Sequence, residues 1–328
     1  MGTLCAMRAA VYRQYGPPSV VRVEDAPAPV AQAGELLVRV IASTVNRTDC
    51  GFLSGKPRIV RFFSGLRAPR ATILGCEFAG LVEQVGAGVT MFAVGQRVFG
   101  YDALKFGGHA EYVTIAETGL VAEVPAGLSF EEAAPIVEGA HYALNMIRAV
   151  KVRPGQKVLV NGGTGGIGSA AVQLFVHYGV RVTAVCATEH LSTLKSLGAE
   201  RVVDYTREDF TALDDVFDVV VDAVGKSSFG RCRRLLLPGG IYVSSELGVG
   251  WQNPLLALTT PLLRRKRVLF PIPKDTRDDV LFLKGLVETG EFRPLIDRSY
   301  PLEQIREAYA YVTAGQKIGN VVIRVREG

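Results

Sequence analysis

Three observations predict an α/β protein built from two domains. The chain has 328 residues, more than a single hydrophobic core usually serves. Its first ~125 residues carry short runs of β-branched residues between Gly and Pro, a pattern typical of the strands and turns of a partly open β-barrel. From Lys157 onward, Val-rich strands alternate with helical segments, which indicates a parallel sheet with helices on both faces.

The barrel strands can be assigned from these runs. They are expected within residues 7–16, 19–27, 34–46, 78–89, 95–102 and 107–117. Between Asp49 and Leu74 the chain shows little periodicity, so we expect a long loop there, and long loops in compact domains are often functional.

The pattern changes to a helical one at residues 129–150, where Ser129 and Glu132 form a capping box. The segments that follow are strand 157–163, helix 168–179, strand 181–187, helix 189–199, strands 201–205 and 217–225, then 229–240 and strand 241–245. Near the end, residues 301–315 predict a helix that stops at Gly315, and 319–325 a strand. We therefore expect one domain from residues 1–125 and 275–328, and a second from 126–274.

Charge and cysteine content exclude several classes of protein. The net charge of +5 is spread along the chain, and the densest basic run, Arg264–Arg267, reads as a solvated face, not a nucleic-acid site. The five cysteines are odd in number and lack Cys-x-x-Cys spacing, which indicates free thiols in a reducing compartment. No secretory signal or membrane span is apparent. We expect a cytoplasmic protein without a nucleic-acid or membrane partner.

A glycine-rich turn follows the first strand of the second domain and fits the pattern G-x-G-x-x-G. Its residues are Gly163, Thr164, Gly165, Gly166, Ile167 and Gly168. Such glycines provide a tight turn, room for a pyrophosphate and close helix packing, while the helix N-terminus attracts phosphate. Because the turn joins a buried strand to an apolar helix, the sequence predicts a dinucleotide site.

The end of the next strand bears on which dinucleotide binds. Sites specific for NAD usually place a carboxylate there to accept from the ribose hydroxyl, but this chain has Cys186. Thr188, Lys195 and Tyr205 are close enough in sequence to line a 2′-phosphate pocket, which favours NADPH. Lys195 also fits a solvated helix position, and Glu189 is an opposing signal.

Together these motifs resemble the zinc-independent quinone oxidoreductase group of the medium-chain dehydrogenases/reductases. The matching segments, in order, are VNRTDCG, ILGCEFAGLVEQVGAGV, GQRVFG, VLVNGGTGGIG, LGAERVVDYTRED, FDVVVDAVG, LLLPGGIYVSS and GNVVIRV. The resemblance implies a GroES-like barrel made from both chain ends around a central Rossmann domain. It also implies a homodimer, which we expect at the sheet edge near residues 243–258, since unpaired edge strands associate readily.

Alcohol dehydrogenases of this superfamily bind a catalytic zinc. Where they have a Cys and a His ligand, this chain has Asn46 and Cys76, and the third ligand region, VEGAHYAL, contains no Cys. The four cysteines of their structural zinc are also missing. Tetrahedral zinc sites need such ligands, so the sequence predicts no metal.

Hydride delivery without a metal requires an acceptor that is already electrophilic, such as a quinone or an α,β-unsaturated carbonyl. Asn46 is our candidate for the catalytic cleft, where its amide would contact cofactor or substrate, although it also suits a turn. Tyr101 is a candidate donor to the developing oxyanion, or a packing residue. The resemblance adds cofactor contacts at Val224, Gly225, Phe270, Ile272 and Asn320.

Three functions fit these features. The leading hypothesis is an NADPH-dependent quinone reductase. The alternatives are an NADPH-dependent enone or alkenal double-bond reductase, and a non-catalytic NADPH-binding protein.

Overall fold

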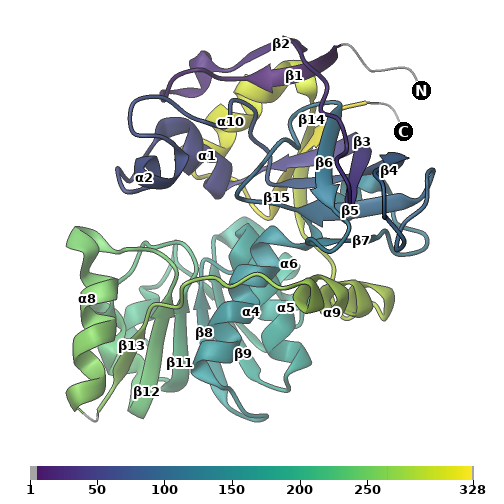
Figure 1. The fold of residues 1–328 in the computed structure, drawn as a ribbon. Coiled ribbons are helices and arrows are strands. Elements are labelled where there is room, and N and C mark those ends of the chain that lie inside the picture. The colour runs from purple at the N-terminus through teal and green to yellow at the C-terminus, as the bar shows by residue number, and fades with distance from the viewer. Residues whose placement is uncertain (1–5, 264, 327–328) are drawn as a thin grey trace. The chain divides into compact units, whose positions relative to one another are not determined.

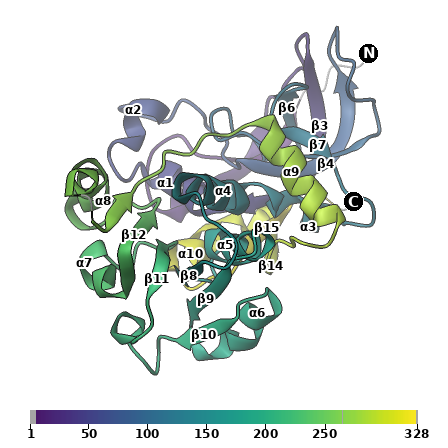
Figure 2. The ribbon, with the colours of Figure 1, turned by 90° about the horizontal axis from the view of Figure 1, so that it is seen from below.

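The computed structural model describes residues 6–263 and 265–326 (Figures 1 and 2). The described chain forms two compact units. Unit 1 comprises Met1–Glu138, Thr276–Glu288 and Ile296–Gly328, and unit 2 comprises Gly139–Asp275 and Thr289–Leu295. The first division thus falls at Glu138 instead of residue 125, because the helical segment 130–136 packs against strands of unit 1.

Unit 1 contains a seven-stranded sheet in the order β14-β15-β3-β4-β5-β7, with β6 paired to β3, and a separate antiparallel pair, β1-β2. Its strands are β1 (Met7–Val11), β2 (Arg22–Ala26), β3 (Glu35–Val45), β4 (Glu77–Val85), β5 (Arg97–Tyr101), β6 (Tyr112–Ala116), β7 (Val121–Glu123), β14 (Ile296–Pro301) and β15 (Asn320–Arg324). Alternating apolar residues of β3, β4, β5 and β6 form its buried core. Strands from both ends of the chain therefore share one sheet, as the barrel prediction requires.

The segment expected to be a loop between Asp49 and Leu74 is partly helical. It contains α1 (Arg47–Ser54) and α2 (Val60–Ser64). Helix α1 begins at a reciprocal capping box between Asn46 and Asp49 and ends at Gly55, whose φ is 59°. The prediction of a long loop was wrong for this part, because α1 is too short to show periodicity. The residues that cap it, Asn46 and Gly55, are typical cap residues.

Unit 2 is built on a six-stranded sheet in the order β10-β9-β8-β11-β12-β13, parallel throughout. Its strands are β8 (Lys157–Asn161), β9 (Arg181–Cys186), β10 (Arg201–Asp204), β11 (Phe217–Asp222), β12 (Leu236–Ser244) and β13 (Arg267–Leu269). This is the strand order of a doubly wound dinucleotide-binding fold. Successive strands are added toward one edge from β8 to β10 and toward the other edge from β11 to β13, so the switch point lies between β8 and β11. Ligands of such sheets bind beyond the carboxyl ends of the strands at that point.

The helices follow the predicted alternation with one break. They are α3 (Phe130–Ala133), α4 (Glu138–Val150), α5 (Gly166–His177), α6 (Leu191–Ser196), α7 (Phe229–Cys232), α8 (Gln252–Thr259), α9 (Arg277–Glu288) and α10 (Ile305–Ala314). The helix predicted over 129–150 is interrupted at Pro135, which has ψ 19° and separates α3 from α4 through a short 3₁₀ turn. Of the helices in the described ranges, none is both long enough and apolar enough to cross a bilayer.

Candidate functional site

The glycine turn of unit 2 lies at the switch point of the sheet, between β8 and α5. Gly162, with φ 76°, turns the chain out of the strand, and the amide of Gly163 donates to the carbonyl of Val185 in β9 over 2.9 Å. Gly165 is the N-cap of helix α5, and no side chain caps the first amides of that helix. The first amides of the helix thus face the carboxyl edge of the sheet, where a helix N-terminus attracts anions.

The glycines of this turn differ in the space beside them. A Cβ atom at Gly168 would lie 2.0 Å from the carbonyl oxygen of Gly162, so this glycine is needed for the helix to pack on the turn. A Cβ at Gly165 would meet nothing closer than 3.6 Å. The backbone is therefore open at Gly165 and closed at Gly168, as expected for a turn that receives a pyrophosphate.

A buried carboxylate orders the opposite side of the switch point. Asp222, the last residue of β11, accepts hydrogen bonds from the amide of Gly225 (3.1 Å) and from Asn161 Nδ2 (3.0 Å) through Oδ1. Its Oδ2 accepts from the Tyr242 hydroxyl (3.0 Å). Asp222 thereby joins β8, β11 and β12 where their carboxyl ends meet, and it fixes the turn at Val224–Gly225. This role cannot be seen in the sequence, because Asn161 and Tyr242 become neighbours of Asp222 only through the pairing of the strands.

The turn after β11 contacts the glycine turn. A Cβ at Gly162 would lie 2.4 Å from Val224 Cγ1, so the Val224 side chain packs directly over that glycine. Val224 and Gly225 are therefore brought together with the predicted phosphate-binding residues.

At the end of β9 the structure differs from the expectation that the Thr188 hydroxyl is available to the cofactor. Thr188 is not a free donor: its hydroxyl donates to Asp204 Oδ2 over 2.5 Å and lies 2.9 Å from the Thr206 hydroxyl. Asp204 ends β10 and pairs in register with Cys186. A carboxylate therefore does stand at this edge, supplied by the neighbouring strand. Hydrogen bonds from Thr188 and Thr206 lower the pKa of Asp204, so it is ionised at neutral pH.

The other residues predicted for unit 2 are more exposed. Tyr205 has 59% of its surface exposed, although its amide donates to the carbonyl of Cys186 over 3.0 Å. Lys195 is exposed in the last turn of α6. Phe270 and Ile272 follow β13, where Phe270 is half-buried and Ile272 is 80% exposed.

In unit 1, Asn46 uses both atoms of its amide within the protein. Its Oδ1 accepts from the backbone amide of Asp49 over 3.0 Å, and its Nδ2 lies 3.0 Å from Cys76 Sγ. Burial raises the pKa of Asp49 to about 7 and that of Cys76 well above its ordinary value. These contacts are those of a cap and turn residue, the alternative role that the sequence left open for Asn46.

A second acidic group lies beside this cap and was not singled out from the sequence. Glu77 is fully buried and accepts from the Thr44 hydroxyl (2.7 Å) and from the amide of Glu138 (2.7 Å). Glu138, in turn, accepts from the Thr48 hydroxyl over 2.7 Å. Burial, and then the charge of Glu138, raise the pKa of Glu77. The signal in the sequence was an acidic residue, Glu77, directly before the apolar run Phe78–Val82.

Tyr101 and Asn320 complete the predicted set in unit 1. Tyr101 ends β5, is 2% exposed and pairs with Glu77 across the strands. Asn320 opens β15 and is 5% exposed. Both are buried strand-end residues.

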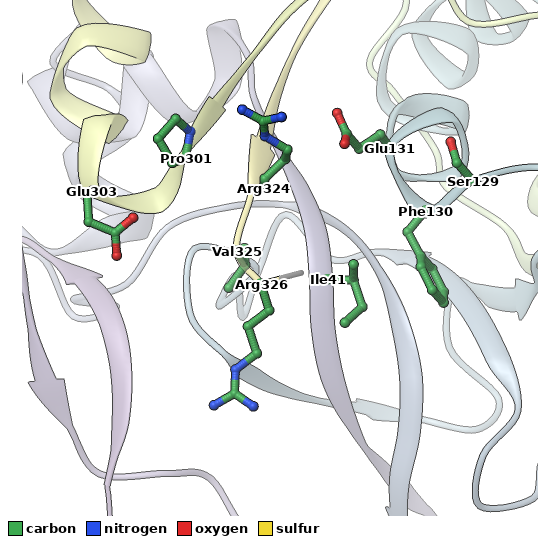
Figure 3. Close-up of a pocket in the computed structure, with 9 residues that line it drawn as sticks. All are labelled: Ile41, Ser129, Phe130, Glu131, Pro301, Glu303, Arg324, Val325 and Arg326. Carbon is green, nitrogen blue, oxygen red and sulfur yellow. The ribbon is translucent and has the colours of Figure 1, made fainter. Parts of the chain in front are cut away.

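A surface pocket of about 650 Å³ in unit 1 lies apart from all of these residues (Figure 3). Arg326 on its rim is paired with Glu111 (2.6 Å), and Glu131 accepts from the Ser299 hydroxyl (2.5 Å). In Figure 3 the Arg326 side chain points away from Arg324. None of the predicted site residues lines this pocket, so it is not the candidate site.

No cluster of three or more His, Cys, Asp or Glu suited to a metal ion occurs among the residues that the structure describes. Asn46 and Cys76, which the resemblance places where alcohol dehydrogenases have zinc ligands, hydrogen-bond to each other. A neutral amide and a protonated thiol are poor zinc ligands, since zinc binds thiolate.

Comparison with known proteins agrees with this architecture. Residues 32–126 match the model of the alcohol dehydrogenase GroES-like domain, and residues 197–323 match that of the zinc-binding dehydrogenase. The chain is 32% identical to 2-methylene-furan-3-one reductase of Solanum lycopersicum, over 97% of this chain and 79% of the relative.

Two further proteins resemble it along nearly its whole length. One is the NADPH-dependent alkenal/one oxidoreductase, chloroplastic, of Arabidopsis thaliana, which is 29% identical over 97% of this chain and 79% of the relative. The other is the solved quinone oxidoreductase from Coxiella burnetii, with a TM-score of 0.86 and 26% identity, covering 98% of this chain and 100% of that one. The glycine turn, the strand order and these matches identify the chain as a nicotinamide-dependent oxidoreductase of the medium-chain dehydrogenase/reductase superfamily, in its quinone oxidoreductase-like group.

Proposed function

We propose that this protein is an NADPH-dependent reductase of quinones that works without a metal ion. The observation that carries the proposal is the open backbone beside Gly165, between the amides that begin α5 and the turn fixed by Asp222. The residues that would hold the dinucleotide are those of the glycine turn together with Val224 and Gly225. When bound, the reduced nicotinamide supplies a hydride to the acceptor.

The protein's contribution is to position the reactants. The turn at Gly163–Gly168 holds the phosphates through backbone amides, which are fixed by the sheet and need no rearrangement. A quinone suits this arrangement because the charge that arrives with the hydride spreads onto an oxygen by conjugation. Asn46 and Tyr101 are both buried and offer no exposed donor, so we propose that the proton for that oxygen comes from solvent.

An enone or alkenal double-bond reductase is the second candidate. Two relatives favour it, since they are named for a furanone and for alkenals and alkenones, respectively. Steady-state turnover with NADPH against a panel of quinones, enones and alkenals separates the two. Turnover confined to quinones supports the first proposal, turnover confined to enones and alkenals supports the second, and none with any acceptor supports a non-catalytic NADPH-binding protein.

For the choice of NADPH we rely on the exposed cation Arg207 at the edge formed by β9 and β10, where it offsets the opposing negative charge of Asp204. Three donors from Thr188 and Thr206 occupy the Asp204 carboxylate, and Arg207 lies 3.5 Å from it with its guanidinium largely exposed. Arg207, Tyr205 and Lys195 are available to a 2′-phosphate. We expect Arg207→Gln to weaken NADPH binding about tenfold, the loss of one charged hydrogen bond, and to change NADH binding little. Arg181→Gln, which removes an arginine paired with Glu200, is the control. Equal weakening of both dinucleotides would contradict the assignment.

Gly165→Ala tests the cofactor site itself. The added methyl group fits the protein alone, since its nearest neighbour is 3.6 Å away, but it occupies the space proposed for the pyrophosphate. We expect an unchanged melting temperature and at least about a tenfold rise in the Kd for NADPH, measured by nicotinamide fluorescence. Unchanged NADPH binding would refute the proposed position of the dinucleotide.

A further inference from the structure

Helix α4 contacts both the glycine turn and the segment that leaves β13. In its first turn, a Cβ atom on Gly139 would lie 2.6 Å from the carbonyl oxygen of Gly166, so α4 packs directly against the start of α5. Further along α4, His141 and Asn145 contact the segment 270–275. One helix thus touches the proposed phosphate site and the chain that leaves the other half of the sheet.

The segment 270–275 contains no helix or strand. It follows β13 at the carboxyl edge of the sheet, which is the edge where ligands of this fold bind. Pro271 and Pro273 lack the N–H that a strand ladder needs, and Ile272 between them is 80% exposed. The position of the segment therefore depends on contacts made by its other residues.

Asn145 holds the backbone of Lys274 through both atoms of its amide. Its Oδ1 accepts from the Lys274 amide over 3.0 Å, and its Nδ2 lies 3.4 Å from the Lys274 carbonyl oxygen. The same Nδ2 donates to the carbonyl of His141 over 2.9 Å, which fixes the Asn145 side chain on α4. This one side chain thereby serves both backbone groups of Lys274, as a neighbouring strand would.

His141 fixes the next residue of the segment. Its Nδ1 lies 2.6 Å from Asp275 Oδ1, and the His141 side chain is 2% exposed. A short pair with one buried member constrains geometry more than a pair that is fully in water. Asp275 is the last residue of unit 2 before the chain returns to unit 1. We call the two pairs, His141–Asp275 and Asn145–Lys274, the α4 clasp.

We propose that the α4 clasp positions the segment 270–275 beside the nicotinamide half of the bound dinucleotide. The inference rests on the proposed function, which places the pyrophosphate at the glycine turn and the 2′-phosphate at the edge of β9 and β10. The nicotinamide half then extends over the other side of the switch point, where β11, β12 and β13 end. His141 and Asn145 are positioning residues, because they act through Asp275 and Lys274 and not on the cofactor itself.

The rival explanation is a purely structural tether, and unit 2 contains a matched example of one. His177 Nδ1 lies 2.7 Å from Glu291 Oε2, so this pair has the same chemistry as His141–Asp275. His177 is the last residue of α5, however, and α5 begins at the carboxyl edge of the sheet. The His177–Glu291 pair is therefore a full helix length away from the proposed dinucleotide site.

Binding measurements with two ligands separate positioning from tethering. NADPH carries both halves of the dinucleotide, whereas 2′,5′-ADP carries the adenosine and the 2′-phosphate but no nicotinamide. The double variant Asn145→Ala, Asp275→Ala should raise the Kd for NADPH about tenfold and leave that for 2′,5′-ADP unchanged, because only the nicotinamide half loses a fixed neighbour. Asp275→Asn keeps an acceptor for His141 and should restore most of the NADPH affinity. Glu291→Gln, the matched control, should bind both ligands as wild type does.

A second measurement needs no substitution. We expect NADPH to slow amide hydrogen exchange in the segment 270–275 of the wild-type protein, followed by mass spectrometry, and 2′,5′-ADP to leave it unchanged. In Asn145→Ala the Lys274 amide loses its acceptor and should exchange at least about tenfold faster. This comparison keeps the proposal testable even if the double variant does not fold.

Three results would overturn the proposal: equal weakening of NADPH and 2′,5′-ADP in the double variant, an equal loss of NADPH affinity in Glu291→Gln, or wild-type exchange in 270–275 that NADPH does not slow. Wild type that binds NADPH and protects the segment, yet reduces no quinone, would refute the proposed reaction and support the positioning role. Wild type that binds neither ligand would refute both.

Discussion

In unit 1 the polar side chains around Asn46 hydrogen-bond to one another, whereas in unit 2 the backbone around Gly165 leaves open space beside it. Asn46, Asp49 and Cys76 each have a partner inside the unit, and Glu77 and Glu138 accept from Thr44 and Thr48. The glycine turn has no side chain to satisfy its outward amides. The comparison teaches that burial and polarity alone do not mark a binding site, which also needs space and unused hydrogen-bonding groups.

The largest expected effect comes from Asp222, which orders the open site. Asp222→Ala would leave buried donors of Asn161 and Tyr242 and the amide of Ser227 without an acceptor. We expect the free energy of unfolding to fall by several kcal/mol, because each buried donor left without an acceptor costs about 1–3 kcal/mol. Urea denaturation measures it. A loss under about 1 kcal/mol would mean that the site is not held by this carboxylate.

Gly168→Ala should act on the fold, in contrast to Gly165→Ala. The added methyl group would sit 2.0 Å from a backbone oxygen, so α5 must move. We expect a loss of about 1–3 kcal/mol in the free energy of unfolding, or somewhat more, because of overpacking. Thermal unfolding of the two alanine variants side by side is the measurement. Similar melting temperatures would show that the two glycines do not differ as described.

The buried acidic residues of unit 1, Glu77 and Asp49, should make the free energy of unfolding depend on pH. The pKa of Glu77 is raised on folding, so the folded protein binds more protons than the unfolded chain above the ordinary value of 4.5, and stability falls as pH rises from there. Glu77→Gln should reduce this fall, by up to about 1.4 kcal/mol per pH unit. Asp49, whose pKa is raised to about 7, leaves a residual slope in the variant. Urea denaturation between pH 5 and pH 8, with both proteins in the same buffers, measures the effect; equal slopes would refute it.

The smallest effect separates the two roles of Asn46. Asn46→Ala removes the cap of α1 and should cost about 1 kcal/mol in the free energy of unfolding, which Asn46→Ser should restore. If Asn46 is only a cap, the Ser variant also keeps the turnover of wild type. A Ser variant of normal stability but strongly reduced kcat would instead support a role in catalysis.

The sequence was informative where the signal is local. The glycine turn, the strands of continuous valine and the capping box at Ser129 each depend on neighbouring residues, and each was predicted. Thr188 was misjudged because its partner, Asp204, belongs to another strand, and only the register of β9 with β10 brings the two together. The role of Asp222 was hidden for the same reason. Contacts between strands depend on topology, which periodicity does not reveal.

The position of β15 has a consequence for biosynthesis. This strand lies inside the sheet of unit 1, between β14 and β3, yet it follows every residue of unit 2 along the chain. During translation, the edge of β3 that pairs with β15 therefore stays unpaired until all of unit 2 has been synthesised. We infer that the domain encoded mainly by the first part of the gene is the last to finish folding, and that chaperones have most to protect in that interval.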